Sequence, residues 1–133
     1  MEKDLQEKIL TYRVLEARLD GLLKQRDALI AKLIEMQSTI ASIEEIEKSD
    51  EFLFQIGSQA YTPGKVIDKN NIVIEVGAGI ALEKTAKEAK ETLESRKKDM
   101  ENFLSEMQGE IETISSTLES LGQELNELAA KGE

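Results

Sequence analysis

The residue types that most often carry out catalysis are missing from this sequence. Its 133 residues include no histidine and no cysteine, so the commonest general base, the thiol nucleophile and the usual zinc ligands are absent. Neighbouring carboxylates such as Glu44 and Glu45 remain, and such pairs can bind metals or transfer protons. Here they lie in densely charged stretches that are typical of solvated helix faces. We therefore predict no enzymatic activity, no catalytic residue, no metal site and no cofactor.

The segment Gly77-Ala78-Gly79 resembles part of a phosphate-binding loop. It lacks the third glycine at the required spacing, and no Lys-Ser or Lys-Thr pair follows it. We interpret the segment as a tight turn with positive φ angles, in which Gly77 and Gly79 are the turn glycines. Gly57 is also interpreted as a turn glycine, because Gly57-Ser58 ends an earlier strand-like run.

The composition and charge exclude several classes of partner. Aromatic residues make up only 4% of the chain, which is little for the core of a compact globule. The net charge is −10, and the sequence lacks the clustered basic surface that nucleic acids and anionic lipids require. No apolar run approaches the roughly 18 residues that span a bilayer, and the first residues lack the apolar core of a signal peptide. We expect a cytoplasmic protein with no nucleic-acid or membrane partner.

Apolar residues recur every seven positions in the first third of the chain. One series comprises Leu5, Tyr12, Leu19, Arg26, Leu33 and Ile40. The other comprises Lys8, Leu15, Leu22, Leu29, Met36 and Ile43. Ten of these twelve positions are apolar, which is typical of a coiled-coil helix and predicts one over residues 1–48.

The last third of the chain has the same periodicity and predicts a second helix over residues 85–133. One series is apolar throughout and comprises Ala86, Leu93, Met100, Met107, Ile114, Leu121 and Leu128. The companion series comprises Leu104, Ile111, Leu118 and Leu125. Lys90 and Lys97 interrupt this companion series, and there Ala89 and Phe103 offer an alternative register.

Residues 49–84 change period and predict two consecutive β-hairpins. The expected strands are Phe52–Ile56, Gln59–Ile67, Ile72–Val76 and Ile80–Leu82, separated by glycine-rich or Asp-Asn-rich turns. Pro63 lies inside the second strand, which predicts a sheet edge or a bulge at that point.

The two helices are expected to pair with each other in an antiparallel orientation. Leu5 to Glu47 and Ala86 to Leu128 both span 42 residues, and at 1.5 Å per residue each helix extends about 60–65 Å. Residues 1–32 contain seven bases against six acids, whereas residues 99–130 contain eight acids and no base. Antiparallel pairing places these complementary halves side by side, and many weak ion pairs together select an orientation.

Four short strands cannot cover their own edges and faces, so the middle of the chain is expected to associate with other chains. A closed β-barrel between subunits is the usual solution. The predicted contact residues are Phe54, Ile56, Val66, Ile72, Ile74, Val76, Ile80 and Leu82. The predicted fold is mainly α with small β: one domain made of residues 1–48, 49–84 and 85–133. Its long antiparallel coiled-coil hairpin has two β-hairpins inserted between the helices, which contribute to an inter-subunit barrel.

The whole chain resembles the alpha class of prefoldin subunits. The resemblance rests on Gly57, Gly64, Glu88-Ala89 and above all the stretch 72–84, in which a Val-Gly-Ala-Gly turn leads into Glu-Lys and the second helix. It implies a hexamer with beta subunits, two alpha and four beta, whose hairpins form a double β-barrel bearing six coiled-coil arms. It also implies that the arm tips hold unfolded client polypeptides without nucleotide and deliver them to a group II chaperonin.

The tips of such an arm are the two ends of the chain, and apolar residues there are candidates for client binding. They are Leu5, Ile9, Leu10, Val14, Leu118, Leu121, Leu125 and Leu128. Each of them could instead simply close the coiled coil. Leu10 and Val14 are the better candidates, because they lie outside both heptad series.

Two other functions are compatible with the same architecture. A homo-oligomer could stack its hairpins end to end and form a structural filament. Alternatively, the chain could be a coiled-coil adaptor whose acidic helix binds a defined basic partner.

Overall fold

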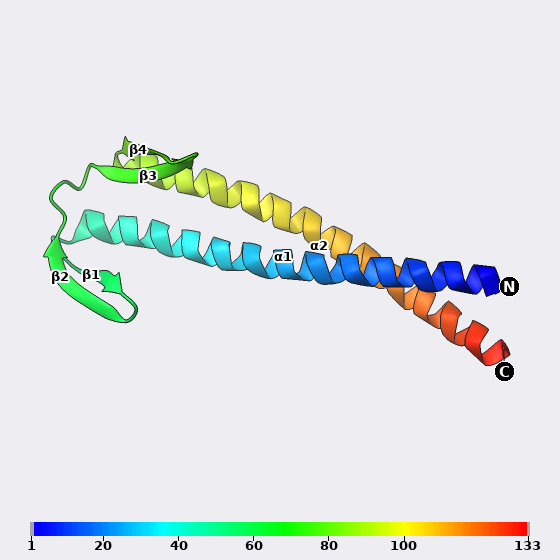
Figure 1. Cartoon of the computed structure of the whole chain (residues 1–133). Helices are drawn as coiled ribbons and strands as arrows, with labels where there is room; N and C mark the ends of the chain where they lie inside the picture. Colours follow the sequence, from blue (N-terminus) through cyan, green and yellow to red (C-terminus); the bar gives the residue numbers. More distant parts are fainter. Residues whose placement is uncertain (1, 133) are drawn as a thin grey trace. The chain divides into compact units, whose positions relative to one another are not determined.

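The computed structural model describes residues 2–132, and it consists of two long helices separated by four short strands (Figure 1). The elements are α1 (Glu2–Lys48), β1 (Glu51–Gly57), β2 (Ala60–Lys65), β3 (Ile72–Gly77), β4 (Ile80–Lys84) and α2 (Ala86–Lys131). The predicted fold class is confirmed: the chain is mainly helical, with two antiparallel hairpins between the helices. Residues 2–132 form no closed barrel by themselves. The predicted outer limits, residues 1 and 133, lie outside the described residues.

The chain divides into two compact units, and each helix contributes to both of them. The terminal unit comprises Met1–Lys32 and Met100–Glu133. The middle unit comprises Leu33–Asp99 and contains both hairpins.

The core of the terminal unit forms where the heptad residues of the two helices meet. Its buried residues are Leu22, Met107, Ile114 and Leu118, and the half-buried residues packed against them are Tyr12, Leu15, Leu19, Leu29 and Ile111. These side chains all belong to the predicted heptad series. The seven-residue period therefore defines the helix interface, because it keeps one face of each helix turned to the other.

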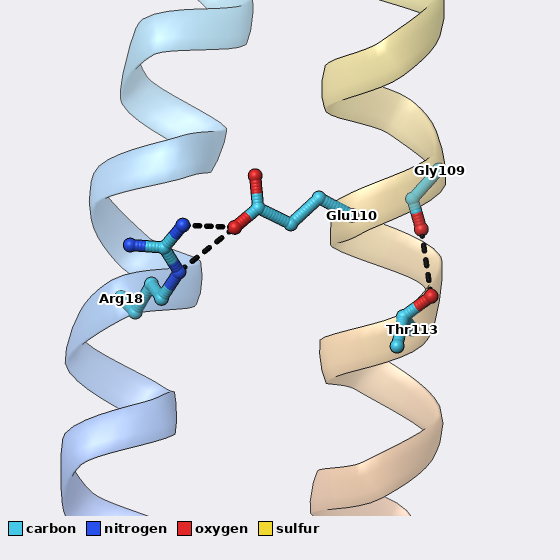
Figure 2. A network of polar contacts seen from close by, with 4 residues as sticks. All are labelled: Arg18, Gly109, Glu110 and Thr113. Atoms are coloured by element: carbon cyan, nitrogen blue, oxygen red, sulfur yellow. Dashed lines mark hydrogen bonds and ion pairs between the residues drawn. The ribbon is translucent and has the colours of Figure 1, made fainter.

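Ion pairs between α1 and α2 show that the helices of the terminal unit run antiparallel. Lys8 Nζ lies 3.1 Å from Glu124 Oε2. Arg18 Nε donates to Glu110 Oε1 at 2.9 Å, as Figure 2 shows.

Helix α2 continues without a break through Gly109. There Thr113 Oγ1 donates to the Gly109 carbonyl at 3.0 Å (Figure 2).

Both helices of the middle unit contribute buried apolar residues. They are Met36, Ile40 and Ile43 on α1 and Ala86, Ala89 and Leu93 on α2. The two lysines that interrupt the heptad both find partners on α1. Lys90 Nζ lies 2.5 Å from Glu47 Oε1, and Lys97 Nζ donates to Gln37 Oε1 at 2.6 Å.

The first hairpin pairs β1 with β2, and its register places Phe54 opposite Thr62 and next to Gly64. The ring of Phe54 covers Gly64 so closely that a β-carbon there would lie 2.8 Å from ring carbons. The turn differs from the prediction in its detail. Gly57 is the last residue of β1, and the positive φ angle of 59° falls on Gln59. Pro63 lies in β2, which is an edge strand because this sheet has two strands.

The second hairpin pairs β3 with β4 and closes with the predicted tight turn. Gly77, Ala78 and Gly79 all have positive φ angles, of 103°, 52° and 75°. Figure 1 shows β3 alongside the beginning of α2, and Arg96 Nη2 donates to the Glu75 carbonyl at 3.0 Å. After β4, the Thr85 hydroxyl accepts a hydrogen bond from the Glu88 amide at 3.2 Å, which caps the first turn of α2.

Candidate functional site

Exposed apolar side chains project from α1 near the end of the terminal unit. Leu10 is 64% exposed and Val14 is 59% exposed, while Ile9 is exposed at 36%. Leu10 and Val14 lie one helical turn apart and outside both heptad series, so they form a short apolar patch that the partner helix does not cover. We call Leu10 and Val14 the outer patch.

A recess lies between the beginning of α1 and the last turns of α2. Its volume is about 290 Å³, and its lining residues are Glu2, Leu5, Leu128, Lys131 and Gly132. Leu5 and Leu128 are half-buried, as are Leu121 and Leu125. Four predicted client-binding residues therefore remain partly accessible while the helices stay paired.

Leu118 has a different position from the other predicted client-binding residues. Its side chain is only 8% exposed and packs in the core with Leu22, Met107 and Ile114. A ligand cannot reach it unless the helices separate, so it belongs to the helix interface. The heptad pattern places Leu118 and Leu125 in the same series, and only the structure shows which of them is deeply buried.

An ion pair links the two helices close to this recess. Lys8 Nζ contacts Glu124 at 3.1 Å and Asp4 Oδ2 at 3.9 Å. The hydrogen bond and the charge of Glu124 raise the pKa of Lys8 above its ordinary value of 10.5, with a smaller contribution from Asp4. The charged Lys8 side chain thus links α1 to α2 close to the ends of both helices.

The hairpins present a second apolar surface. Of the predicted contact residues, Ile56, Ile80, Leu82, Val76 and Phe54 are exposed, by 70% for Ile56 and 38% for Phe54. Val66 and Ile72 are half-buried. Ile74 is only 7% exposed, so its side chain is buried within the middle unit and is not accessible to another chain.

Further exposed apolar residues of this region escaped the sequence prediction. They are Leu53, Tyr61, Ile67 and Val73. Leu53 and Tyr61 share the face of the first hairpin opposite Phe54, as their register shows. The unbroken apolar run from Phe52 to Phe54 could have revealed a strand that is apolar on both faces.

The strand edges of both hairpins are free to pair with another chain. Within residues 2–132, β1 pairs only with β2 and β3 only with β4, so each strand has one unpaired edge. Open edges beside exposed apolar residues are a template for further strand pairing.

An ion pair lies next to these hairpins. Lys69 Nζ lies 2.8 Å from Asp50 Oδ1, and the hydrogen bond and charge of Lys69 lower the pKa of Asp50.

Neither a metal centre nor a membrane span is found in the described part of the chain. No group of three or more potential metal-ligating side chains is found in residues 2–132. None of their helices is both long and apolar enough to cross a bilayer.

Comparisons with known proteins identify the family. A family model described as prefoldin subunit matches residues 15–131. Prefoldin subunit alpha of Pyrococcus horikoshii is 27% identical over 133 residues, covering 97% of this chain and 90% of the relative. Prefoldin subunit alpha 1 of Thermococcus kodakarensis is 30% identical over 100 residues, covering 73% of this chain and 68% of the relative.

A solved structure supports the fold. It is a cryo-EM structure of filamentous PFD from Methanocaldococcus jannaschii, with a TM-score of 0.70 and 22% identity, covering 90% of this chain and 98% of that one. At this identity the likeness concerns the fold.

The sequence relatives, which span most of the chain, confirm the resemblance to alpha-class subunits. This chain belongs to the prefoldin subunit family, whose function is of the chaperone type.

Proposed function

We propose that this chain is the alpha subunit of an ATP-independent holdase, which binds unfolded polypeptides at the ends of its coiled coil. The observation that carries this proposal is the outer patch, since Leu10 and Val14 are 64% and 59% exposed without any role in the helix interface. Exposed apolar side chains of this kind mark surfaces that bind other apolar groups.

Binding at the chain ends would consist of several weak apolar contacts. A fully buried Leu or Val side chain contributes about 1.5–3 kcal/mol, so the outer patch and the recess beside Leu5 and Leu128 each supply a modest share. Several arms acting on one polypeptide raise the overall affinity without requiring a defined sequence. Such binding suits clients that share only their exposed apolar segments.

Assembly would occur through the hairpins. Their unpaired strand edges and exposed residues such as Ile56 and Ile80 support pairing with the hairpins of other chains. By analogy with the alpha class, we propose prefoldin beta subunits as partners, in a hexamer of two alpha and four beta subunits with an inter-subunit β-barrel. Delivery to a group II chaperonin in the cytoplasm belongs to the same proposal.

The experiment is an aggregation assay on the complex formed by mixing this chain with a prefoldin beta subunit. A chemically unfolded client is diluted into the complex without ATP, and light scattering is followed. The Leu10→Ser, Val14→Ser double variant should require roughly threefold to tenfold more complex for the same suppression. Ile34→Ser is the matched control, because Ile34 is also an exposed α1 residue, at 66%, but lies in the middle unit.

The outcomes separate the possibilities. Suppression by the wild type and the control, together with a loss in the double variant, supports client binding at the outer patch. Equal suppression by all three complexes removes the outer patch from the mechanism. A wild-type complex that never suppresses aggregation refutes the holdase proposal.

A filament is the second candidate function. The fold is similar to that of filamentous PFD from Methanocaldococcus jannaschii, and the open strand edges permit end-to-end pairing of identical hairpins. Light scattering on this chain alone distinguishes the two candidates. Long polymers would favour the filament, whereas a small species that forms a discrete complex only with a beta subunit would favour the holdase.

A further inference from the structure

Phe103 is an exposed aromatic residue that the pairing of the helices does not explain. The heptad pattern allowed it as an alternative interface position, but its side chain is 57% exposed. The neighbouring Leu104 is half-buried and continues the helix interface in its place. Phe103 therefore lies beside the interface rather than in it.

A recess opens next to this ring within the terminal unit. Its volume is about 120 Å³, and its lining residues are Leu22, Phe103, Glu106, Met107 and Glu110. Leu22 and Met107 belong to the core and are 9% and 5% exposed, so the recess gives access to the apolar helix interface. It has room for a single aliphatic side chain.

Carboxylates border the recess. Arg18 of α1 pairs with Glu110, whereas Glu106 forms no ion pair with any residue in the range 2–132. The surrounding sequence is strongly acidic, since residues 99–130 contain eight acids and no base. An aromatic face next to a carboxylate attracts a cation, because the negative face of the ring and the carboxylate act in the same direction.

We propose that the recess beside Phe103 is a second client-binding point, which takes an apolar side chain adjoining a lysine or arginine. This inference rests on the proposed holdase function and specifies the client segments that the arm prefers. The apolar side chain enters between Phe103, Leu22 and Met107. The adjacent cation lies over the Phe103 ring, within reach of Glu106. Segments in which acids flank the apolar residue are disfavoured by the charge of Glu106.

Fluorescence anisotropy on the assembled complex tests the proposal. The probes are two labelled unstructured peptides with the same Leu and Phe residues, flanked by Lys and Arg in one and by Glu in the other. Phe103→Ala should weaken binding of the basic peptide roughly tenfold. Glu106→Gln should weaken it about threefold and leave the acidic peptide unchanged or slightly tighter.

Two variants serve as matched controls. Ile34→Ala removes an exposed apolar side chain from α1, and Glu119→Gln removes an exposed carboxylate elsewhere on α2. Both should leave the binding of the basic peptide unchanged. Circular dichroism of each complex verifies that the helices remain folded, and Glu106→Gln alters charge alone, so its result stands even where Phe103→Ala perturbs packing.

The outcomes separate this inference from the proposed function. If the wild-type complex suppresses aggregation but neither Phe103→Ala nor Glu106→Gln weakens the basic peptide, the recess is not a client site and the holdase function stands. An equal loss in Glu119→Gln also overturns the inference, because the preference would then reflect the general charge of α2. If the wild-type complex binds neither peptide and suppresses no aggregation, both proposals fail.

Discussion

Gly64 shows how one residue position controls a local structure. Because a β-carbon at this position would lie 2.8 Å from Phe54 Cδ2 and Cε2, Gly64→Ala must displace the ring. We expect the first hairpin to lose about 1 kcal/mol, measured by amide hydrogen exchange in β1 and β2. Gly21→Ala is the control, because nothing lies within 4 Å of its added carbon, and this helical site should gain about 0.5–1 kcal/mol. Unchanged exchange in Gly64→Ala would contradict the close packing.

The ion pair between Asp50 and Lys69 predicts that the stability of the fold depends on pH. The hydrogen bond and charge of Lys69 lower the pKa of Asp50 below 3.8. A carboxyl group whose pKa is lowered by folding stabilises the fold above its unfolded pKa, and this contribution is lost as the pH falls through the folded value. Asp50→Asn should therefore lower the thermal midpoint slightly at pH 6, and this loss should be smaller at pH 2.5, where more of the carboxyl group is protonated. An equal effect at both pH values would contradict this ion pair.

The two long helices carry buried apolar residues at heptad positions and exposed apolar residues outside them, and the two kinds should differ in their contribution to stability. Leu118→Ala removes a buried side chain from the core and should destabilise the terminal unit by about 2–5 kcal/mol. Leu10→Ala removes an exposed one and should cost less than about 0.5 kcal/mol. Urea unfolding followed by circular dichroism measures both. Similar losses in the two variants would mean that Leu10 is packed.

The helices and strands themselves could be predicted from the sequence, because their periods are local properties of the chain. Apolar residues that recur every seven positions predicted both helices, and runs of β-branched residues between glycines predicted the hairpins. Packing details could not be predicted in this way. Ala89 enters the interface at the alternative register whereas Phe103 does not, and Gln59 rather than Gly57 adopts the positive φ angle. These outcomes depend on how neighbouring elements contact one another, which a local pattern does not record.

At the scale of the whole molecule, the candidate surfaces were predictable only in part. Leu10 and Val14 stood out because they fall outside the heptad, and the structure leaves them exposed. The recess beside Phe103 combines residues of α1 and α2 that are about eighty positions apart in the sequence. Only antiparallel pairing in one particular register brings them together, so no motif in the sequence indicates this recess.

We proposed that this chain assembles with other chains through its hairpins, and the Ile80→Lys variant tests this. Ile80 is 56% exposed in the isolated chain, so a lysine there should leave the helix content and thermal midpoint of this chain nearly unchanged. If the second hairpin is buried between subunits, the same lysine places an unpaired charge in an apolar contact, which costs several kcal/mol. Mixing with a beta subunit should then yield no discrete complex by light scattering.

Ile34→Lys is the control for this experiment, because it introduces the same charge at an exposed α1 site of the middle unit. It should assemble like the wild type. Full assembly of Ile80→Lys would show that β4 remains in contact with solvent in the complex. The unpaired edges and apolar residues of the first hairpin, Ile56 among them, would then be the surface through which this chain joins its partners.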